Sequence, residues 1–281
     1  MTGSLEIKPE VITELETMAR NIRQDIIEMI YTVQSGHPGG SLSATDIVTA
    51  LYFYFMRVNP ENPNWAQRDR FVLSKGHACP VWYSALAEKG FFPKEELLTL
   101  RKINSRLQGH PVMGKPPGID VTTGSLGQGL SLGVGMALGL KLDGGDSRVY
   151  VLISDGELNE GQIWEAAMAA AKFNLDNLIV VLDYNNLQLD GWCSDVMPIE
   201  PIADKWHAFN WEVFEMNGHD MREIIKTIKI AQSIKGKPSI IIAHTIKGKG
   251  VSYMENKCEW HGKSPNDEQY EQAMRELGID K

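Results

Sequence analysis

The sequence predicts an α/β fold in which a parallel sheet is covered by helices on both faces. Three near-continuous runs of Val, Ile and Leu support this prediction, at residues 149–154, 178–183 and 239–244. Such runs are typical of strands buried on both faces, and the stretches between them have helical character. A shorter apolar run at residues 70–74 predicts a further strand. There is no internal repeat, low-complexity tract or linker, so we expect one domain over residues 1–281.

Helices are predicted before and between these strands. Apolar residues recur at helical spacing from Leu15 to Val33, and Gly36 ends the pattern. The run from Ser43 to Asp46 is typical of a capping box, and an apolar helix is expected after it, over residues 47–56. The other predicted helices lie at residues 80–89, 126–140 and 161–173.

Composition excludes several classes of protein. The 281 residues carry a formal net charge of −8, and lysines and arginines are dispersed, so nucleic acid is not an expected partner. Cys79, Cys193 and Cys258 lie far apart without a CxxC pair, which predicts reduced, buried thiols. The first twenty residues lack the apolar centre of a signal peptide, and no stretch approaches the roughly 18 apolar residues of a membrane span. We therefore expect a cytoplasmic protein without a membrane partner.

Polar residues follow two of the predicted strands. Asp155 comes after the strand at 149–154, and Asn185 follows the strand at 178–183. In a right-handed βαβ unit both lie at carboxyl ends of parallel strands, and in adjacent strands they point into one crevice. Carboxylate and amide oxygens suit Mg²⁺ or Ca²⁺, and so few protein ligands leave room for substrate phosphates. The pair therefore predicts a metal-bridged diphosphate, with Gly156 leaving space for a phosphate.

Glycine is concentrated in two neighbouring segments. Residues 108–124 lack periodicity, which predicts a long ordered loop, and such loops are often functional. The helical run after them contains Gly127, Gly129, Gly133, Gly135 and Gly139. Each helical glycine costs up to about 1 kcal/mol relative to alanine, so something must approach this backbone closely. A packed helix or subunit interface and a bound cofactor both remain open. A Rossmann dinucleotide site is not supported, because Leu132 occupies the place of the third glycine.

The stretch SDGELNEG, with Asn185 and Asn186 further along, resembles the diphosphate-binding motif of thiamine-diphosphate enzymes, a GDG turn followed by an asparagine pair. Ser154 replaces the first glycine, a departure that leaves the metal ligand unchanged. The resemblance implies a thiamine-diphosphate-binding fold of the diphosphate-binding type. It also implies that Asp155, the Asn185 side chain and the Leu187 carbonyl bind Mg²⁺, with Ca²⁺ or Mn²⁺ as alternatives. Gly156 and Glu157 are then expected to bind the cofactor.

Within that superfamily the chain is similar to transketolases over its length. The motifs SGHPGG, SKGHA, QGHP and CEWHGKSP contain His37, His77, His110 and His261, where transketolases carry active-site histidines. The resemblance implies catalytic roles for all four and cofactor contacts for His77 and His261. The loop VTTGSLGQG matches the family's cofactor-contacting loop, which implies thiamine contacts from the backbones of Gly124 and Leu126. The glycine-rich helix is then expected at a subunit interface.

The resemblance also implies an activity and a partner. Transketolases transfer a two-carbon glycolaldehyde unit from a ketose phosphate to an aldose phosphate, a reaction of the pentose phosphate pathway. Their chains usually continue into pyrimidine-binding and C-terminal domains, and the first of these supplies the glutamate that activates the cofactor. We therefore expect the N-terminal subunit of a split transketolase, whose partner in an α₂β₂ heterotetramer is a C-terminal subunit. The histidines would stabilise oxyanions and move protons.

Two other functions remain open at this point. One is half of an enzyme like 1-deoxyxylulose-5-phosphate synthase, and the other is a non-catalytic cofactor-binding or regulatory protein. Glu160 and Glu165 match acidic positions near the family's dimer interface, but they are equally typical of a solvated helix face. Lys247 and Lys249 are candidates for a substrate phosphate, although a flexible surface loop is favoured. Structural roles are expected for His207, His219 and His244, and core positions for Trp164, Trp192 and the methionines.

Overall fold

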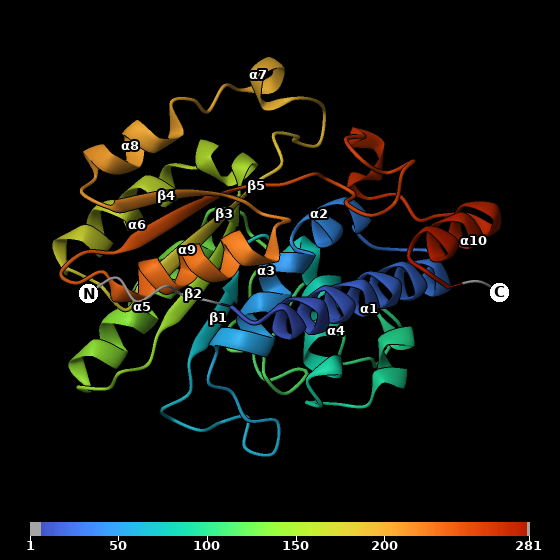
Figure 1. Cartoon of the computed structure of the whole chain (residues 1–281), viewed down its shortest axis with the longest axis horizontal. Coiled ribbons are helices and arrows are strands. Elements are labelled where there is room, and N and C mark those ends of the chain that lie inside the picture. Colours follow the sequence, from blue (N-terminus) through green and yellow to red (C-terminus); the bar gives the residue numbers. More distant parts are fainter. Residues whose placement is uncertain (1–6, 280–281) are drawn as a thin grey trace.

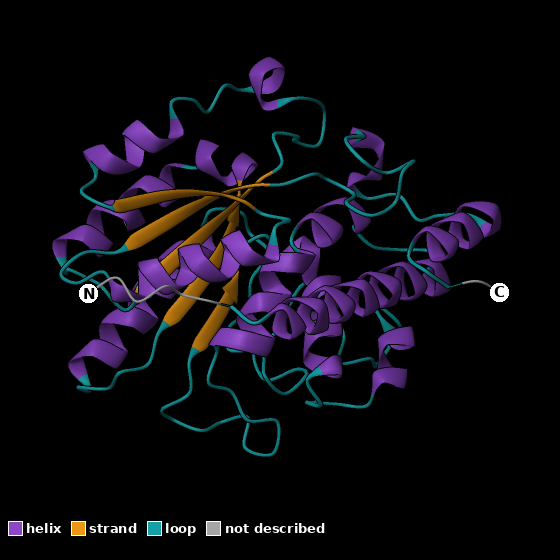
Figure 2. Cartoon of the chain, in the orientation of Figure 1, coloured by secondary structure: helices purple, strands orange, loops and turns teal. Residues whose placement is uncertain are grey.

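The computed structural model describes residues 7–279. The first six of the twenty N-terminal residues that lack a signal-peptide pattern lie outside it. Its centre is a five-stranded sheet (Figures 1 and 2). The strands are β1 (Arg70–Leu73), β2 (Val149–Ser154), β3 (Leu178–Tyr184), β4 (Glu212–Asn217) and β5 (Ser239–His244). Every pairing is parallel, and the spatial order is β1-β2-β3-β5-β4. The α/β class with a parallel sheet is confirmed.

Helices of very different length surround the sheet. The α-helices are α1 (Pro9–Val33), α2 (Pro38–Ser43), α3 (Thr45–Ala50), α4 (Cys79–Glu88), α5 (Gln128–Leu142), α6 (Gly161–Lys172), α7 (Cys193–Val196), α8 (Ile202–Ala208), α9 (Met221–Ser233) and α10 (Asp267–Glu276). A π-helical turn, η1, spans Leu51–Phe55, and 3₁₀ segments are η2 (Gly76–Ala78), η3 (Lys94–Thr99), η4 (Asp155–Asn159) and η5 (Cys258–His261). Among the described helices, none is both long and apolar enough to cross a membrane.

The two faces of the sheet are covered by different helices. Helices α5 and α8 contact the sheet on one face, with α6 packed against α5, while α9 lies on the other face beside α1 and α3 (Figure 1). Alternate residues of β2 divide between two cores: Val149 and Val151 belong to the first, and Tyr150 and Leu152 to the second. This alternation follows from the strand period of two. Because both faces of β2 are buried, its sequence is a nearly continuous apolar run.

Strand β4 is absent from the sequence prediction. It lies at the edge of the sheet, paired only with β5, and most of its side chains are partly exposed. Glu212 and Glu215 therefore face solvent and interrupt the apolar run. An edge strand with charged residues lacks the pattern that identified the buried strands.

The predicted capping box at Ser43 is wrong. Ala44 precedes α3, without a side-chain cap. The hydroxyl of Ser43 instead donates to the buried carboxylate of Asp183, 2.5 Å away. A long-range partner has replaced the local one, because a buried carboxylate needs several hydrogen bonds. The predicted helix at 47–56 is also interrupted, since α3 ends at Ala50 and a π turn follows.

Some of the residues assigned to the core lie on the surface. Trp192 is 42% exposed, and Met113, Met168 and Met197 are more than half exposed. Trp164 does pack as expected, with its ring centroid 5.4 Å from that of Trp206. All three cysteines are free thiols; Cys79 and Cys193 are buried as predicted, whereas Cys258 is partly exposed.

Candidate active site

A cavity lies where the carboxyl ends of the strands meet. Lys75 follows β1, Asp155 follows β2, Asn185 follows β3 and Lys247 follows β5, and all four line one cavity of about 360 Å³. Strands β2 and β3 are adjacent, with Ser154 opposite Asp183 in the register. The carboxyl edge of a parallel sheet is the usual ligand site of open α/β folds.

Most of the predicted site residues border this cavity. Those that line it are His77, Leu126, Asp155, Gly156, Asn185, Leu187 and His261. A Cβ atom added to Gly156 would meet only the Gln188 side chain, at 3.8 Å, so the turn leaves open space beside it. The loop before α5, the β2 and β3 turns and η5 therefore converge on one volume, although they are far apart in the chain.

Asp155 lines the predicted crevice, but it is buried in the cavity wall and is not a surface residue. Its residue exposure is 2%, and its Oδ1 accepts from the backbone N–H of Gly156 at 2.8 Å. Oδ2 is buried and has no hydrogen-bond partner in the described part of the chain. Burial and repulsion from Asp183 raise the pKa of Asp155 to about 6. A buried carboxylate oxygen without a partner is a position where a cation would be stabilised.

The two other predicted metal ligands lie beside it. The Asn185 Oδ1 accepts from the backbone N–H of Leu187 at 3.2 Å, and the carbonyl of Leu187 accepts from Lys247 at 3.1 Å. Each oxygen has a second lone pair. The described residues contain no cluster of three or more His, Cys, Asp or Glu that could hold a metal. A carboxylate, an amide and a carbonyl fit a hard cation that takes its remaining oxygens from a ligand.

Lys247 is part of this wall, so the expectation that it belongs to a flexible surface loop is wrong. The residue is 2% exposed. Its ammonium donates to the carbonyls of Leu187 and Gln188, each at 3.1 Å, and lies 3.2 Å from Nδ1 of His261. Burial lowers its pKa. Lys249, two residues on, is partly exposed and pairs with Glu255 at 3.5 Å.

A buried ion pair that the sequence did not predict lies at the wall of the cavity. Lys75 and Asp183 form it, and their side chains are 1% and 0% exposed. Lys75 also donates to the Gly40 carbonyl at 2.8 Å. Although burial alone would raise the pKa of Asp183, the Lys75 ammonium and the hydroxyls of Ser43 and Thr245 lower it. The sequence does contain an indication of this pair: Asp183 is a charged residue within an apolar strand, and such a residue needs a buried partner.

Three of the four predicted histidines form a cluster. The ring centroids are 5.2 Å apart for His37 and His77, 5.4 Å for His37 and His261, and 5.0 Å for His77 and His261. Burial and nearby positive groups lower the pKa of His37 to about 4 and that of His261 to about 3, and the pKa of His77 falls too. The rings are therefore neutral near pH 7 and can each donate and accept one hydrogen bond.

His110 and Gly124 lie next to this cluster without lining the cavity. His110 is exposed, and a Cβ atom on Gly124 would come within 3.0 Å of its ring. Gly124 also has φ +148°, which favours glycine. Arg101, a further residue that the sequence analysis missed, lies 3.3 Å from Nδ1 of His37 and 3.5 Å from the Gly109 carbonyl.

The acidic residues after β2 have different positions. Glu157 does not line the cavity, and its carboxylate accepts hydrogen bonds from Ser74, Ser154 and the backbone of Gly127. Its side chain therefore joins three loops outside the lining of the cavity. The expected contact of Glu157 with the cofactor stays a prediction. Glu160 is exposed and lines the cavity, and Glu165 is exposed on α6.

Comparison with known proteins identifies the family. The family model described as transketolase, thiamine diphosphate binding domain matches residues 15–281. The chain belongs to the transketolase family. Among solved structures, the transketolase of Leishmania mexicana superposes with a TM-score of 0.90 at 32% identity, covering 95% of this chain and 41% of that one. The thiamine-diphosphate-binding α/β fold is thereby confirmed.

Curated transketolases fall into two length classes relative to this chain. It is 47% identical to a Phocaeicola vulgatus protein named as one subunit of apulose-4-phosphate transketolase, covering 95% of this chain and 94% of that protein. It is also 47% identical to the 6-deoxy-6-sulfo-D-fructose transketolase subunit SqwG of a Clostridium species, covering 94% and 96%. Human transketolase is 42% identical, but the match covers only 42% of its length.

Proposed function

We propose that the chain is the thiamine-diphosphate-binding subunit of a two-subunit transketolase. With its partner it would transfer a two-carbon glycolaldehyde unit from a ketose phosphate to an aldose phosphate. The observation that carries the proposal is the unpartnered Asp155 Oδ2, buried in a cavity that Asn185 and two of the clustered histidines also line. This combination supplies a cation site and neutral proton donors at the same sheet edge.

We assign the metal site to Asp155, the Asn185 side chain and the Leu187 carbonyl, with Mg²⁺ as the ion. Thiamine diphosphate, when bound, supplies the nucleophilic carbon that accepts and releases the two-carbon unit. Gly156 leaves the adjoining turn open for a diphosphate. Because Lys247 donates to the Leu187 carbonyl, the ammonium and the metal would share that oxygen through its two lone pairs.

The histidines would act on the sugar. Neutral imidazoles suit this work, since each offers one N–H to a substrate oxygen and one acceptor for a hydroxyl proton. In His261, Nδ1 faces the Lys247 ammonium, so the ring proton lies on Nε2. We propose the same class of role for His37, His77 and His110, with contacts to the thiamine from the backbones of Gly124 and Leu126.

The partner would be a chain with the pyrimidine-binding domain, in a cytoplasmic α₂β₂ assembly. Two similar proteins are named as subunits of transketolases, and the match covers nearly their whole length. Their names give two different sugars, apulose 4-phosphate and 6-deoxy-6-sulfo-D-fructose. The residues of this chain then form one diphosphate-binding domain. A place in the pentose phosphate pathway is part of the same proposal.

A donor assay separates this function from its alternatives. The chain, its partner, Mg²⁺ and thiamine diphosphate should convert xylulose 5-phosphate and an aldose phosphate into a ketose two carbons longer than the aldose. Consumption of pyruvate with release of CO₂ would instead indicate a 1-deoxyxylulose-5-phosphate synthase. Tight cofactor binding without turnover of any ketose phosphate would favour a non-catalytic role. Asp155→Ala serves as the inactive control.

A further inference from the structure

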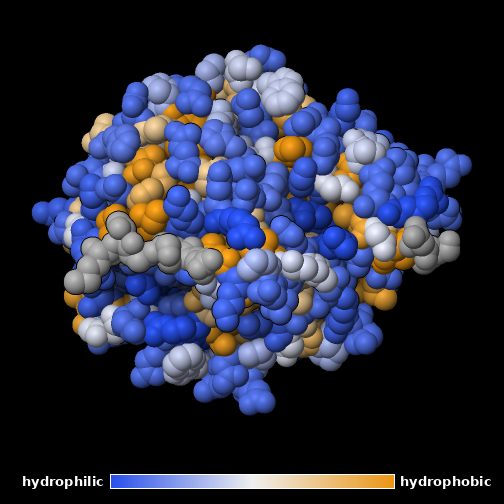
Figure 3. All heavy atoms as spheres, viewed as in Figure 1, coloured by the Kyte–Doolittle hydropathy of each residue, from blue (hydrophilic) through white to orange (hydrophobic). Residues whose placement is uncertain are grey.

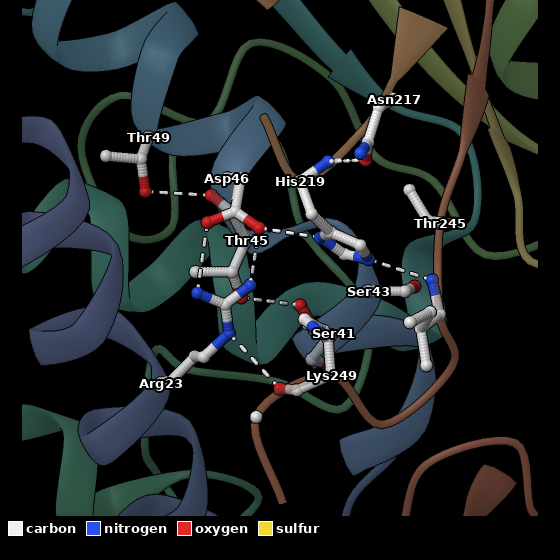
Figure 4. A network of polar contacts seen from close by, with 12 residues as sticks. Arg23, Ser41, Ser43, Thr45, Asp46, Thr49, Asn217, His219, Thr245 and Lys249 are labelled. Atoms are coloured by element: carbon white, nitrogen blue, oxygen red, sulfur yellow. Dashed lines mark hydrogen bonds and ion pairs between the residues drawn. The ribbon is translucent and has the colours of Figure 1, made fainter. Parts of the chain in front are cut away.

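Three charged or polar side chains from distant segments pack against the loop that carries Lys247. They are Arg23 of α1, Asp46 of α3 and His219, which lies between β4 and α9 (Figure 4). The guanidinium of Arg23 donates to both carboxylate oxygens of Asp46, at 3.0 and 2.6 Å. Nδ1 of His219 lies 2.7 Å from the Oδ2 of Asp46. The carboxylate therefore joins an arginine and a histidine.

The outer ends of this network hold the backbone of the loop. Nε2 of His219 accepts from the N–H of Ile246 at 2.8 Å, so Nδ1 carries the ring proton and donates to Asp46. Nε of Arg23 donates to the carbonyl of Lys249 at 3.2 Å. The network thus binds the loop on both sides of Lys247, which is the residue that enters the cavity.

The network is buried, and its charged groups are paired with one another. Arg23 is 9% exposed and Asp46 is 7% exposed. Burial alone would raise the pKa of Asp46, but the Arg23 guanidinium and the hydrogen bond from His219 lower it to about 2. Buried ion pairs are weak sources of stability compared with apolar residues of similar volume. Their directional hydrogen bonds do, however, fix the position of what they hold.

We infer that Arg23, Asp46 and His219 are positioning residues for the cofactor site: they fix residues 246–249 so that Lys247 reaches the wall of the cavity. This inference rests on the proposed cofactor function. Lys247 makes three polar contacts in that wall, to Leu187, Gln188 and His261. Since each contact lies between 3.1 and 3.2 Å, a small displacement of the loop would break all three.

Substitutions at His219 test the inference, because one removes the hydrogen bonds of the ring and another can keep them. His219→Leu removes both bonds and leaves the Ile246 N–H without a partner. His219→Gln is the rescue variant, since its amide can donate to Asp46 and accept from Ile246. His244→Leu is the matched control: His244 precedes the same loop, but it is exposed and pairs with Glu215.

Two measurements are compared across these variants. In the chain alone, hydrogen–deuterium exchange of residues 245–250 should accelerate in His219→Leu and stay near wild type in His219→Gln and His244→Leu. In the assembly with its partner, the KM for thiamine diphosphate at fixed Mg²⁺ should rise about 10-fold or more in His219→Leu, as for residues that orient site groups. The kcat at saturating cofactor should change much less.

The outcomes separate this inference from the proposed function. Unchanged exchange in His219→Leu, or an unchanged KM for the cofactor, would overturn the positioning role. If His219→Leu does not fold, His219→Asn takes its place, because the shorter amide cannot reach Asp46 and Ile246 together. An unchanged cofactor KM in that variant would overturn the positioning role instead. If the wild-type assembly fails to bind thiamine diphosphate, the proposed function is wrong, while the exchange experiment still tests whether the network holds the loop.

Discussion

At the scale of single residues, the proposed metal ligand Asp155 has a cost in stability. Its pKa rises from 3.8 to about 6 in the folded, metal-free chain, because it is buried and lies near Asp183. The folded state therefore holds this proton more tightly than the unfolded state, so stability is retained below pH 3.8 and declines as pH rises through about 6. The full effect corresponds to roughly 3 kcal/mol.

Asp155→Asn should therefore stabilise the metal-free chain while destroying its site. At pH 8 in EDTA, urea unfolding should give a free energy higher than wild type by about 1–3 kcal/mol, and at pH 4 the gain should largely vanish. Calorimetry should show loss of Mg²⁺-dependent thiamine-diphosphate binding. The same variant with wild-type cofactor affinity would refute the metal assignment, and equal stability at pH 8 would refute the buried, repelled carboxylate.

His261 provides the second prediction at this scale. It lines the cavity, yet it comes from a 3₁₀ segment well after the diphosphate motif, so we expect it to act on substrate. In the assembly, His261→Ala should lower kcat/KM by roughly 10²-fold or more, the range for positioned acid–base groups. His207→Ala, on the exposed side of α8, is the control. Wild-type kinetics in His261→Ala would show that the ring is structural.

The residue types and spacings predict part of this site and miss another part. Asp155 and Asn185 were predictable, because polar residues directly after buried parallel strands point into the ligand crevice. The burial of Lys247 was not, since a lysine in a glycine-rich stretch is locally typical of a surface loop. Its partners are two carbonyls and a histidine from other segments. Only the tertiary fold brings these groups together.

At the scale of elements, the burial of a strand determines whether its sequence pattern predicts it. The bounds of β2 and β5 match the predicted runs, because both strands are covered on each face and contain almost only apolar residues. Strand β4 was missed because one of its edges and most of its side chains meet solvent. The capping box failed because the partner of Ser43 is Asp183, 140 residues away in the chain. Local patterns do not encode such contacts.

The glycines of helix α5 lie in two different environments. A Cβ atom on Gly133 would come within 2.4 Å of Val151 in the sheet, whereas one on Gly135 would meet nothing within 4 Å. Gly133→Ala should therefore lower the free energy of unfolding by about 1–3 kcal/mol through overpacking. Gly135→Ala should raise it by up to about 1 kcal/mol, because alanine favours the helix. Chemical denaturation of the two variants of the isolated chain measures both.

The same helix can be tested as an interface. Gly129 is buried against Ser74 and Gly133 against Val151 of the chain's own sheet, but Gly135 and Gly139 are open to solvent. An open glycine in a helix is explained if a second copy of the chain comes close to it. Sedimentation of Gly135→Leu should then show weaker self-association than wild type. Unchanged association would leave the outer glycines of this helix without that explanation.

At the scale of the whole molecule, the cavity opens beside exposed apolar residues. Leu126 and Leu189 line it and are 38% and 60% exposed, and Trp192 and Met197 follow shortly after in the chain. On the face shown in Figure 3, hydrophilic side chains predominate, with apolar side chains in patches between them. Large apolar side chains at a polar cavity mouth are typical of a surface that another protein covers.

The last prediction concerns this partnership. The cavity holds the groups that we propose for a metal and a diphosphate, but exposed leucines line it, so a cofactor bound by this chain alone would remain open to water. We therefore expect no transketolase activity from the purified chain, none from a subunit carrying the pyrimidine-binding domain, and activity from their mixture, which analytical ultracentrifugation should resolve as α₂β₂. Leu189→Asp should weaken this assembly by placing a charge in the covered mouth, while Ile103→Asp, also exposed but outside the cavity lining, should not. Robust turnover by the chain alone would show that its site is complete without a partner, because water exclusion and cofactor activation would then have to come from residues within it.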